Sequence, residues 1–187
     1  MNYTLPFTAI VGMDLVKRSL LYHAIDPRLG GLLLMGHRGC AKSTLARAFR
    51  EILPAPDTAE TTPFVEVPLG TSEDRLLGSI DASRLLENGE WSTQTGLIQQ
   101  ANGGVLYIDE VNLLPDHLVD SILDSAASGQ HHIERDGLSK TVSARYILIG
   151  SMNPEEGELR PQLTDRFMHG IFVRDDFSVE ERREIVR

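Results

Sequence analysis

Lys42 and Ser43 follow a glycine-rich stretch, 36–41, and could together hold the phosphates of a nucleotide. An apolar run, 32–35, precedes this stretch, and a helical pattern, 44–49, follows it. In this order of strand, loop and helix, backbone N–H groups and the positive end of the helix converge on phosphate groups. The lysine would reach the β- and γ-phosphates, and the Ser43 hydroxyl would bind Mg²⁺. The residues expected to contact the nucleotide are Gly36, Gly39, Cys40, Ala41, Lys42, Ser43 and Thr44.

Asp109 and Glu110 directly follow a second apolar run, 105–108. A buried strand that delivers adjacent acids at its carboxyl end can hold Mg²⁺ and orient an attacking water. The glycine-rich stretch or the acidic pair alone can arise by chance. Together, in this order, they predict a nucleoside-triphosphate hydrolase.

Ala41 stands where the usual phosphate-binding loop has glycine, directly before the lysine. Glycine suits this position because the backbone passes close to phosphate and a Cβ takes up room. Alanine adds one methyl group, so we interpret it as a tolerated variant. The alternative is a loop that binds nucleotide without turning it over.

The composition is that of one acidic globular domain. The 187 residues allow a single sizeable core, and 41% of them are hydrophobic. The 27 acidic and 18 basic residues leave a net charge of −9, which argues against nucleic acid as the main partner. A single cysteine, Cys40, excludes an internal disulfide and fits a reducing compartment. Short apolar runs and an N-terminus without a signal-peptide pattern lead us to expect a cytoplasmic protein with no membrane partner.

Strands alternate with helices along the chain, which predicts a mostly parallel sheet with right-handed crossovers. The expected strands cover 32–35, 64–69, 105–108 and 146–149, and helices are expected at 44–53, from Ser72, and at 115–127. Another helix is expected to begin with Asp14 as its cap. Its apolar face would consist of Leu15, Val16, Leu20, Leu21 and Ile25.

Two segments do not fit the alternation. Residues 79–95 contain either a short helix from Asp81 to Leu86 or a hairpin that turns at 88–89. The pattern at 133–142 predicts a β-hairpin with an Asp-Gly turn at 136–137.

The last residues begin a helix, because Ser178 and Glu181 have the spacing of a capping box. The helix stops at Arg187 in its third turn, so we expect a truncated C-terminal helical domain. The expected division is a nucleotide-binding core at 1–177 and the start of the truncated helical domain at 178–187.

Asn153 and Arg166 are the remaining polar candidates. Asn153 follows the strand 146–149 closely and could touch the γ-phosphate or the attacking water; otherwise it caps the next turn. Arg166 could form a surface ion pair of little energetic value. It could instead be an arginine finger that acts on a neighbouring subunit.

Other charged groups receive the plainer interpretation. His131, His132 and Glu134 could suggest a metal site, but paired histidines at the base of a hairpin are more often surface residues. The run 155–158 is interpreted as a solvated acidic loop. His37 and Arg38 are assigned no chemistry.

Four stretches closely resemble the AAA+ ATPase subunit of magnesium chelatase. They are Ile10-Val11-Gly12, the loop 36–44, the stretch 104–114 around the two acids, and the stretch 153–167. The resemblance implies an α/β P-loop AAA+ core with a mostly parallel five-stranded sheet flanked by helices. It also implies a helix-2 insert at 79–95, a β-hairpin at 131–145 before the sensor-1 strand, and a C-terminal helical lid.

The resemblance implies roles for single residues. Asp109 would bind Mg²⁺ and Glu110 would be the general base. Asn153 would be sensor 1, and Arg166 would be the finger acting on the next subunit of a hexameric ring. Ile10 and Val11 would lie near adenine. Ala41 departs from the chelatase loop and is similar to MoxR-type ATPases.

The expected function is that of an ATP–Mg²⁺ hydrolase, the motor subunit of a ring. It would remodel a partner with a von Willebrand A domain and serve a tetrapyrrole-binding chelatase subunit. A MoxR-type chaperone ATPase shares these motifs. A nucleic-acid motor is less favoured. Its hairpins should carry basic side chains, but here Arg135 and Lys140 are nearly balanced by the acidic Glu134 and Asp136. A non-hydrolysing binding module is disfavoured by Glu110.

Overall fold

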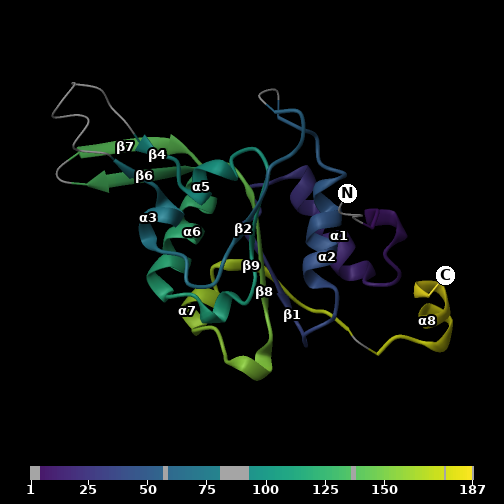
Figure 1. Ribbon diagram of the computed structural model, residues 1–187. Helices are drawn as coiled ribbons and strands as arrows, with labels where there is room; N and C mark the ends of the chain where they lie inside the picture. The colour runs from purple at the N-terminus through teal and green to yellow at the C-terminus, as the bar shows by residue number, and fades with distance from the viewer. Residues whose placement is uncertain (1–4, 57–58, 81–92, 136–137, 175, 187) are drawn as a thin grey trace.

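A parallel sheet forms the centre of the molecule (Figure 1). The computed structural model describes residues 5–56, 59–80, 93–135, 138–174 and 176–186. The sheet has five strands in the order β2-β5-β8-β1-β9, and every neighbouring pair is parallel. This confirms the predicted sheet. The strands are β1 (Gly31–Met35), β2 (Phe64–Val67), β5 (Val105–Ile108), β8 (Ile147–Met152) and β9 (Phe167–Phe172).

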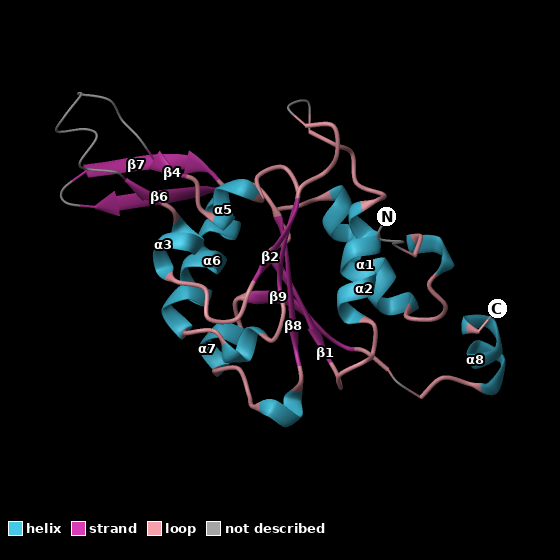
Figure 2. Ribbon diagram, in the orientation of Figure 1, coloured by secondary structure: helices cyan, strands magenta, loops and turns pink. Residues whose placement is uncertain are grey.

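Helices cover both faces of the sheet (Figure 2). On one face lie α1 (Asp14–Ile25) and α2 (Lys42–Arg50), and on the other lie α3 (Glu73–Leu77), α5 (Leu97–Gln100), α6 (Asp116–Ser128) and α7 (Pro161–Thr164). Alternating side chains of β1 divide the apolar interior accordingly. Leu32 and Leu34 pack with α1 and α2, whereas Leu33 packs with the cluster that includes α6. Short 3₁₀ turns occupy Phe7–Ala9, Val111–Leu113 and Pro154–Glu156.

The prediction for α1 was wrong in two respects. Asp14 is the first helical residue, and Met13, in a left-handed conformation, is the N-cap without a side-chain hydrogen bond. Val16 and Leu20 are buried as expected, but Leu15, Leu21 and Ile25 are exposed. The helix therefore buries a narrower stripe than its apolar content indicates, and polar Ser19 and His23 complete the buried face.

Two small antiparallel pairs stand apart from the central sheet. β6 (Gln130–Arg135) pairs with β7 (Leu138–Ser143), which confirms the predicted hairpin. β3 (Ser79–Ile80) pairs with β4 (Thr93–Gln94), so the ends of the segment 79–95 lie side by side. The turn at 136–137 and the two alternatives for 81–92 lie outside the described residues.

The last helix, α8 (Val179–Ile185), lies away from the sheet (Figure 1). Ser178 and Glu181 form both bonds of the predicted capping box. No residue of α8 is buried. Its assignment to a separate helical domain from residue 178 stays a prediction. Among the described residues, every helix is too short or too polar to cross a membrane.

Candidate functional site

The strand order brings the two predicted stretches to one edge of the sheet. β8 lies between β1 and β5, with Met35 opposite Met152 and Ile108 opposite Gly150. The loop after β1 and the acids after β5 therefore flank the end of β8. In a parallel sheet, this carboxyl edge is where ligands bind.

The phosphate loop holds its lysine at the start of α2. Lys42 is the first residue of α2, and its Nζ donates hydrogen bonds of 2.7 Å to the Gly36 carbonyl and 2.8 Å to the His37 carbonyl. Gly39 and Ala41 both have positive φ, of 85° and 58°. These left-handed residues turn the chain into the helix. Cys40, between them, is a buried free thiol and belongs to the apolar cluster that includes residues of α1 and α2.

Asp109 is oriented by two buried neighbours. Its Oδ1 accepts a 2.9 Å hydrogen bond from the Tyr107 hydroxyl and a 2.6 Å bond from the Ser151 hydroxyl. Burial raises the pKa of Tyr107 well above its ordinary value, so the phenol stays protonated and can donate. Both bonds end on the same oxygen, which leaves Oδ2 as the oxygen available to a cation.

Glu110 occupies a left-handed backbone conformation, with φ of 54°. Such a conformation is uncommon for a residue with a side chain and is often found at functional sites. The Glu110 N–H donates to the Ser151 hydroxyl at 3.3 Å. Ser151 thus contacts both acids. Nothing in the local sequence marks Ser151 as a site residue, although it lies two residues before Asn153.

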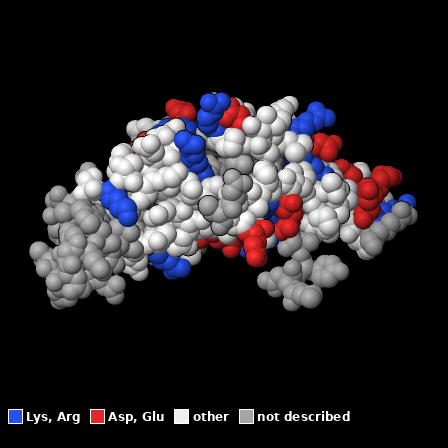
Figure 3. Space-filling model, turned by 90° about the horizontal axis from the view of Figure 1, so that it is seen from above, with Lys and Arg blue, Asp and Glu red and all other residues white. Residues whose placement is uncertain are grey.

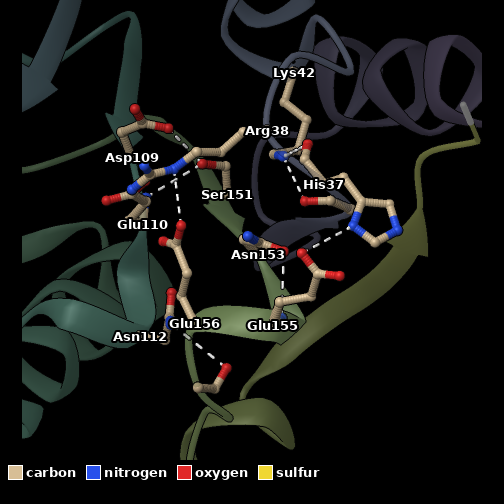
Figure 4. Close-up of polar contacts among 12 residues, drawn as sticks. His37, Arg38, Lys42, Asp109, Glu110, Asn112, Ser151, Asn153, Glu155 and Glu156 are labelled. Atoms are coloured by element: carbon tan, nitrogen blue, oxygen red, sulfur yellow. Dashed lines mark hydrogen bonds and ion pairs between the residues drawn. The ribbon is translucent and has the colours of Figure 1, made fainter.

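Arg38 contacts two carboxylates (Figure 4). Its Nη2 lies 2.9 Å from Glu110 Oε1, and its Nε lies 2.8 Å from Glu156 Oε1. The neighbouring His37 Nδ1 lies 3.4 Å from Glu155 Oε2. The hydrogen bond that Arg38 donates to Glu110 raises the pKa of Arg38 above its ordinary value.

The interpretation of 155–158 as a solvated loop holds for Glu155 and Glu158, which are exposed, but not for Glu156. His37 and Arg38, which were assigned no chemistry, are exposed and contact carboxylates. Glu156 is only 24% exposed, and Arg38 bridges it to Glu110. The long sequence separation hides this contact, because residue 38 meets residue 110 only through the strand order.

The position of Asn153 is compatible both with capping the following turn and with contacting the γ-phosphate or the attacking water. It is buried, and its Oδ1 accepts a 3.3 Å hydrogen bond from the Glu155 N–H, which is the capping role. It also lines a cavity of about 430 Å³. The other lining residues are Arg38, Gly39, Cys40, Ala41, Lys42, Ser43, Thr44, Asp109, Glu110, Ser151 and Met152.

The residues around this cavity fit ATP and Mg²⁺. The cavity is within the usual range for small-ligand sites. Lys42 Nζ is bonded only to backbone carbonyls, so its charge meets no carboxylate among the described residues. Asp109 and Ser43 supply the oxygen ligands that Mg²⁺ prefers. The arrangement can bind a polyphosphate and place one carboxylate near it.

Ile10 and Val11 do not line this cavity. Ile10 is buried against α2 residues in one apolar cluster, and Val11 is partly exposed. Their contact with adenine stays a prediction.

Arg166 lies outside the cavity and pairs with α6. Its Nη1 contacts Asp120 and its Nη2 contacts Asp124. It does not line the cavity at its own phosphate loop. The surface ion pair is thus formed, and the action on a neighbouring subunit stays a prediction.

The histidine pair at the hairpin differs from its interpretation as surface residues. His131 is buried, and burial lowers its pKa. His132 is exposed and its Nδ1 lies 2.9 Å from the Thr141 hydroxyl. The described residues contain no group of three or more side chains arranged to hold a metal ion.

The chain matches a family model and is similar to several known proteins. The family model of the AAA domain (dynein-related subfamily) matches residues 31–167. The magnesium-chelatase 38 kDa subunit of Cereibacter sphaeroides is 45% identical over 212 aligned positions, which cover 100% of this chain and 64% of that subunit. An uncharacterised protein of Mycobacterium tuberculosis is 50% identical over 182 positions, which cover 97% of this chain and 29% of that protein.

A solved structure shares the fold and much of the sequence. It describes the complex between subunits BchI and BchD of magnesium chelatase. The match has a TM-score of 0.87 and 45% identity, and it covers 98% of this chain and 65% of that chain. This chain therefore spans less than two thirds of the length of each of these relatives.

Proposed function

This chain belongs to the AAA domain family, dynein-related subfamily, and from that premise we propose that it is an ATP–Mg²⁺ hydrolase. It would act as the motor of a magnesium-chelatase-like complex. The observation that carries the proposal is the convergence of Lys42, Asp109 and Glu110 on one cavity at the carboxyl edge of the sheet.

The phosphate loop supplies the binding half of the reaction. Backbone N–H groups at the start of α2 and the charge of Lys42 would hold the β- and γ-phosphates. Asp109 and Ser43 would hold Mg²⁺, which neutralises phosphate charge when bound. The bonds from Tyr107 and Ser151 keep the Asp109 carboxylate in a fixed orientation.

Glu110 supplies the catalytic half. Its carboxylate would accept a proton from the attacking water as general base. Asn153 would contact that water or the γ-phosphate as sensor 1, since its amide lines the same cavity.

We place this hydrolase in a homo-oligomeric ring, with six subunits as the expected number. The solved relative is a complex between two different chelatase subunits, BchI and BchD, which supports a partner subunit for this chain. Arg166 would act on the γ-phosphate of the next subunit. The partner would carry a von Willebrand A domain, and a tetrapyrrole-binding subunit would complete a chelatase. The single free cysteine supports a reducing compartment, the cytoplasm.

A MoxR-type chaperone ATPase is the second candidate, because Ala41 departs from the chelatase phosphate loop. The chelatase subunit aligns over 212 positions, more than the 187 residues of this chain, so it carries residues without a counterpart here. The mycobacterial relative aligns over 182 positions. The chain is thus similar to a chelatase subunit and to a protein of uncharacterised function, and the partner of this chain would decide between the two candidates.

A nucleic-acid motor has little support. On the face drawn in Figure 3, basic and acidic side chains are interspersed, and the described residues form no continuous basic surface there. Weak charge attraction to a polyanion is expected for such a surface.

The test is Lys42→Ala, because it removes the charge that meets the phosphates. Calorimetric titration with ATP and Mg²⁺ should show binding by the natural chain and none by the variant. Arg47→Ala is the matched control, since it removes a cation from the same helix where the side chain pairs with Glu66. Equal affinity in Lys42→Ala and the natural chain would refute the proposed site. Affinity purification that recovers a tetrapyrrole-binding subunit would separate the chelatase from the MoxR-type candidate.

A further inference from the structure

Arg38, in the phosphate loop, donates hydrogen bonds to one carboxylate oxygen of Glu110. Glu110 Oε1 accepts from Nη2 at 2.9 Å and from Nε at 3.2 Å of the same guanidinium. The Glu110 side chain is 16% exposed, so water screens this contact only partly. Two guanidinium N–H groups on one oxygen hold the Glu110 carboxylate in this orientation, beside Arg38.

The contact extends beyond one pair. Arg38 Nε also lies 2.8 Å from Glu156 Oε1, in the 3₁₀ turn that Asn153 caps. The other oxygen of Glu156, Oε2, is buried without a hydrogen-bond partner among the described residues. Arg38 is a cation in contact with this partly buried carboxylate. Arg38 thus ties the phosphate loop to both chain segments that follow β5 and β8.

Arg38 is also placed to respond to a ligand. It lines the cavity together with Lys42, and its side chain is 71% exposed. An anion that enters the loop competes with the two carboxylates for the guanidinium, because all three are acceptors for the same donors.

We propose that Arg38 clasps Glu110 in the nucleotide-free protein and that a bound nucleoside triphosphate opens this clasp. Arg38 is then a positioning residue that holds the carboxylate of the general base beside the phosphate loop until nucleotide is present. The inference rests on the proposed function, because it assigns regulation to the same site.

The test is a double-mutant cycle on nucleotide affinity. AMP-PNP with Mg²⁺ is titrated calorimetrically into the natural chain, Arg38→Ala, Glu110→Gln and the double variant. With Arg38 present, Glu110→Gln should tighten binding about two- to fivefold, the range for releasing one partly exposed ion pair. In the Arg38→Ala background, the same change should leave affinity unaltered. The difference between backgrounds should shrink in about 0.5 M salt because the contact is ionic.

Equal tightening in both backgrounds would overturn the clasp, because Glu110 would then act only by repelling the nucleotide. Arg38→Lys gives a second comparison should Arg38→Ala not fold. One ammonium cannot bridge both carboxylates as the guanidinium does, so an intermediate tightening is expected.

Two controls separate this inference from the proposed function. Arg28→Ala removes an exposed arginine paired with Asp26 before β1, at the opposite edge of the sheet, and should leave affinity unchanged. Lys42→Ala should abolish AMP-PNP binding. If it does so while the two backgrounds behave alike, the clasp alone is wrong. If Lys42→Ala still binds, the proposed function fails, whatever the cycle shows.

Discussion

The Ser151 hydroxyl donates a 2.6 Å hydrogen bond to Asp109 Oδ1, and this bond joins the ends of two neighbouring strands. Ser151 belongs to β8 and Asp109 follows β5, so the sheet register fixes their distance. The same hydroxyl accepts from the Glu110 N–H. A small side chain on the central strand therefore sets the orientation of the proposed metal ligand and supports the backbone of the proposed base.

Ser151→Ala should weaken Mg²⁺-dependent nucleotide binding by roughly tenfold, the lower end of the range for losing a group that orients a metal ligand. Binding measured without Mg²⁺ should change little. Calorimetric titration at several Mg²⁺ concentrations checks this. Ser121→Ala, which removes a hydroxyl bonded to its own helix on α6, is the control. An unchanged Mg²⁺ dependence would show that Tyr107 alone orients Asp109.

Ala41→Gly should stabilise the protein. Ala41 has φ of 58°, a conformation that costs an L-residue with a Cβ about 1–2 kcal/mol. Glycine avoids that cost but loses more entropy on folding, so the net gain should be about 0.5–1 kcal/mol. Urea unfolding measures it.

The control is Ala46→Gly in the interior of α2, where glycine should destabilise. A loss of stability in Ala41→Gly would mean that the methyl group makes contacts worth more than the backbone strain. Nucleotide affinity should not fall in Ala41→Gly, because glycine widens the space near the phosphates.

The sequence predicts the parts of the site whose signals are local. The apolar run before Lys42 and the run before Asp109 each identify a buried strand followed by reactive side chains, and both predictions are confirmed as strands. The capping box at Ser178 is likewise a contact between residues three apart in the chain. Such patterns are visible because their partners lie within one turn or one strand.

The parts that were missed depend on contacts between distant residues. Arg38 meets Glu110, 72 positions away, and Ser151 meets Asp109, 42 positions away. Both pairs form only once β8 lies between β1 and β5. Leu15 and Ile25 were predicted to lie on the buried face of α1 but are exposed. The cause is related, because apolar periodicity does not show how much of the helix surface the sheet covers.

Arg166→Ala should bind ATP but hydrolyse it poorly, because the guanidinium would stabilise transition-state charge on a neighbouring subunit. Its present partners, Asp120 and Asp124, would have to release it. Mixing Arg166→Ala with Lys42→Ala should restore part of the activity, since a mixed interface then has one intact loop and one intact arginine. Steady-state phosphate release is measured over a series of mixing ratios.

The mixing experiment requires rings shown to exchange subunits. Arg160→Ala is the control, because Arg160 pairs with Asp116 on the same helix α6. Absence of recovery at every ratio would mean that Arg166 acts within its own subunit or only as a surface ion pair.

Stability should fall as the pH drops below about 6.5, in part because of His23. Burial lowers the pKa of His23 from its ordinary value of 6.5, against an opposing hydrogen bond to the Ser19 carbonyl and together with nearby His169. The fold therefore favours neutral His23, whereas the unfolded chain takes up the proton first. The stability is fully present above about 6.5 and is lost as the pH falls through the folded-state pKa.

His23→Leu should reduce the difference in urea-unfolding free energy between about pH 7.5 and about pH 5.5, on either side of the ordinary histidine pKa. Some dependence should remain, because burial lowers the pKa of His131 as well. The exposed His117→Gln is the control. An unchanged pH dependence in His23→Leu would show that other groups cause the acid sensitivity.

In the proposed mechanism, Glu110 performs the chemistry while Asp109 holds the metal. Its most direct test measures ATP–Mg²⁺ affinity and single-turnover hydrolysis in Glu110→Gln and Asp109→Asn. Glu110→Gln should bind ATP–Mg²⁺ at least as tightly as the natural chain and hydrolyse it roughly two to four orders of magnitude more slowly. Asp109→Asn should lose Mg²⁺-dependent binding. Hydrolysis at the natural rate in Glu110→Gln, or loss of binding alone in both variants, would contradict the account.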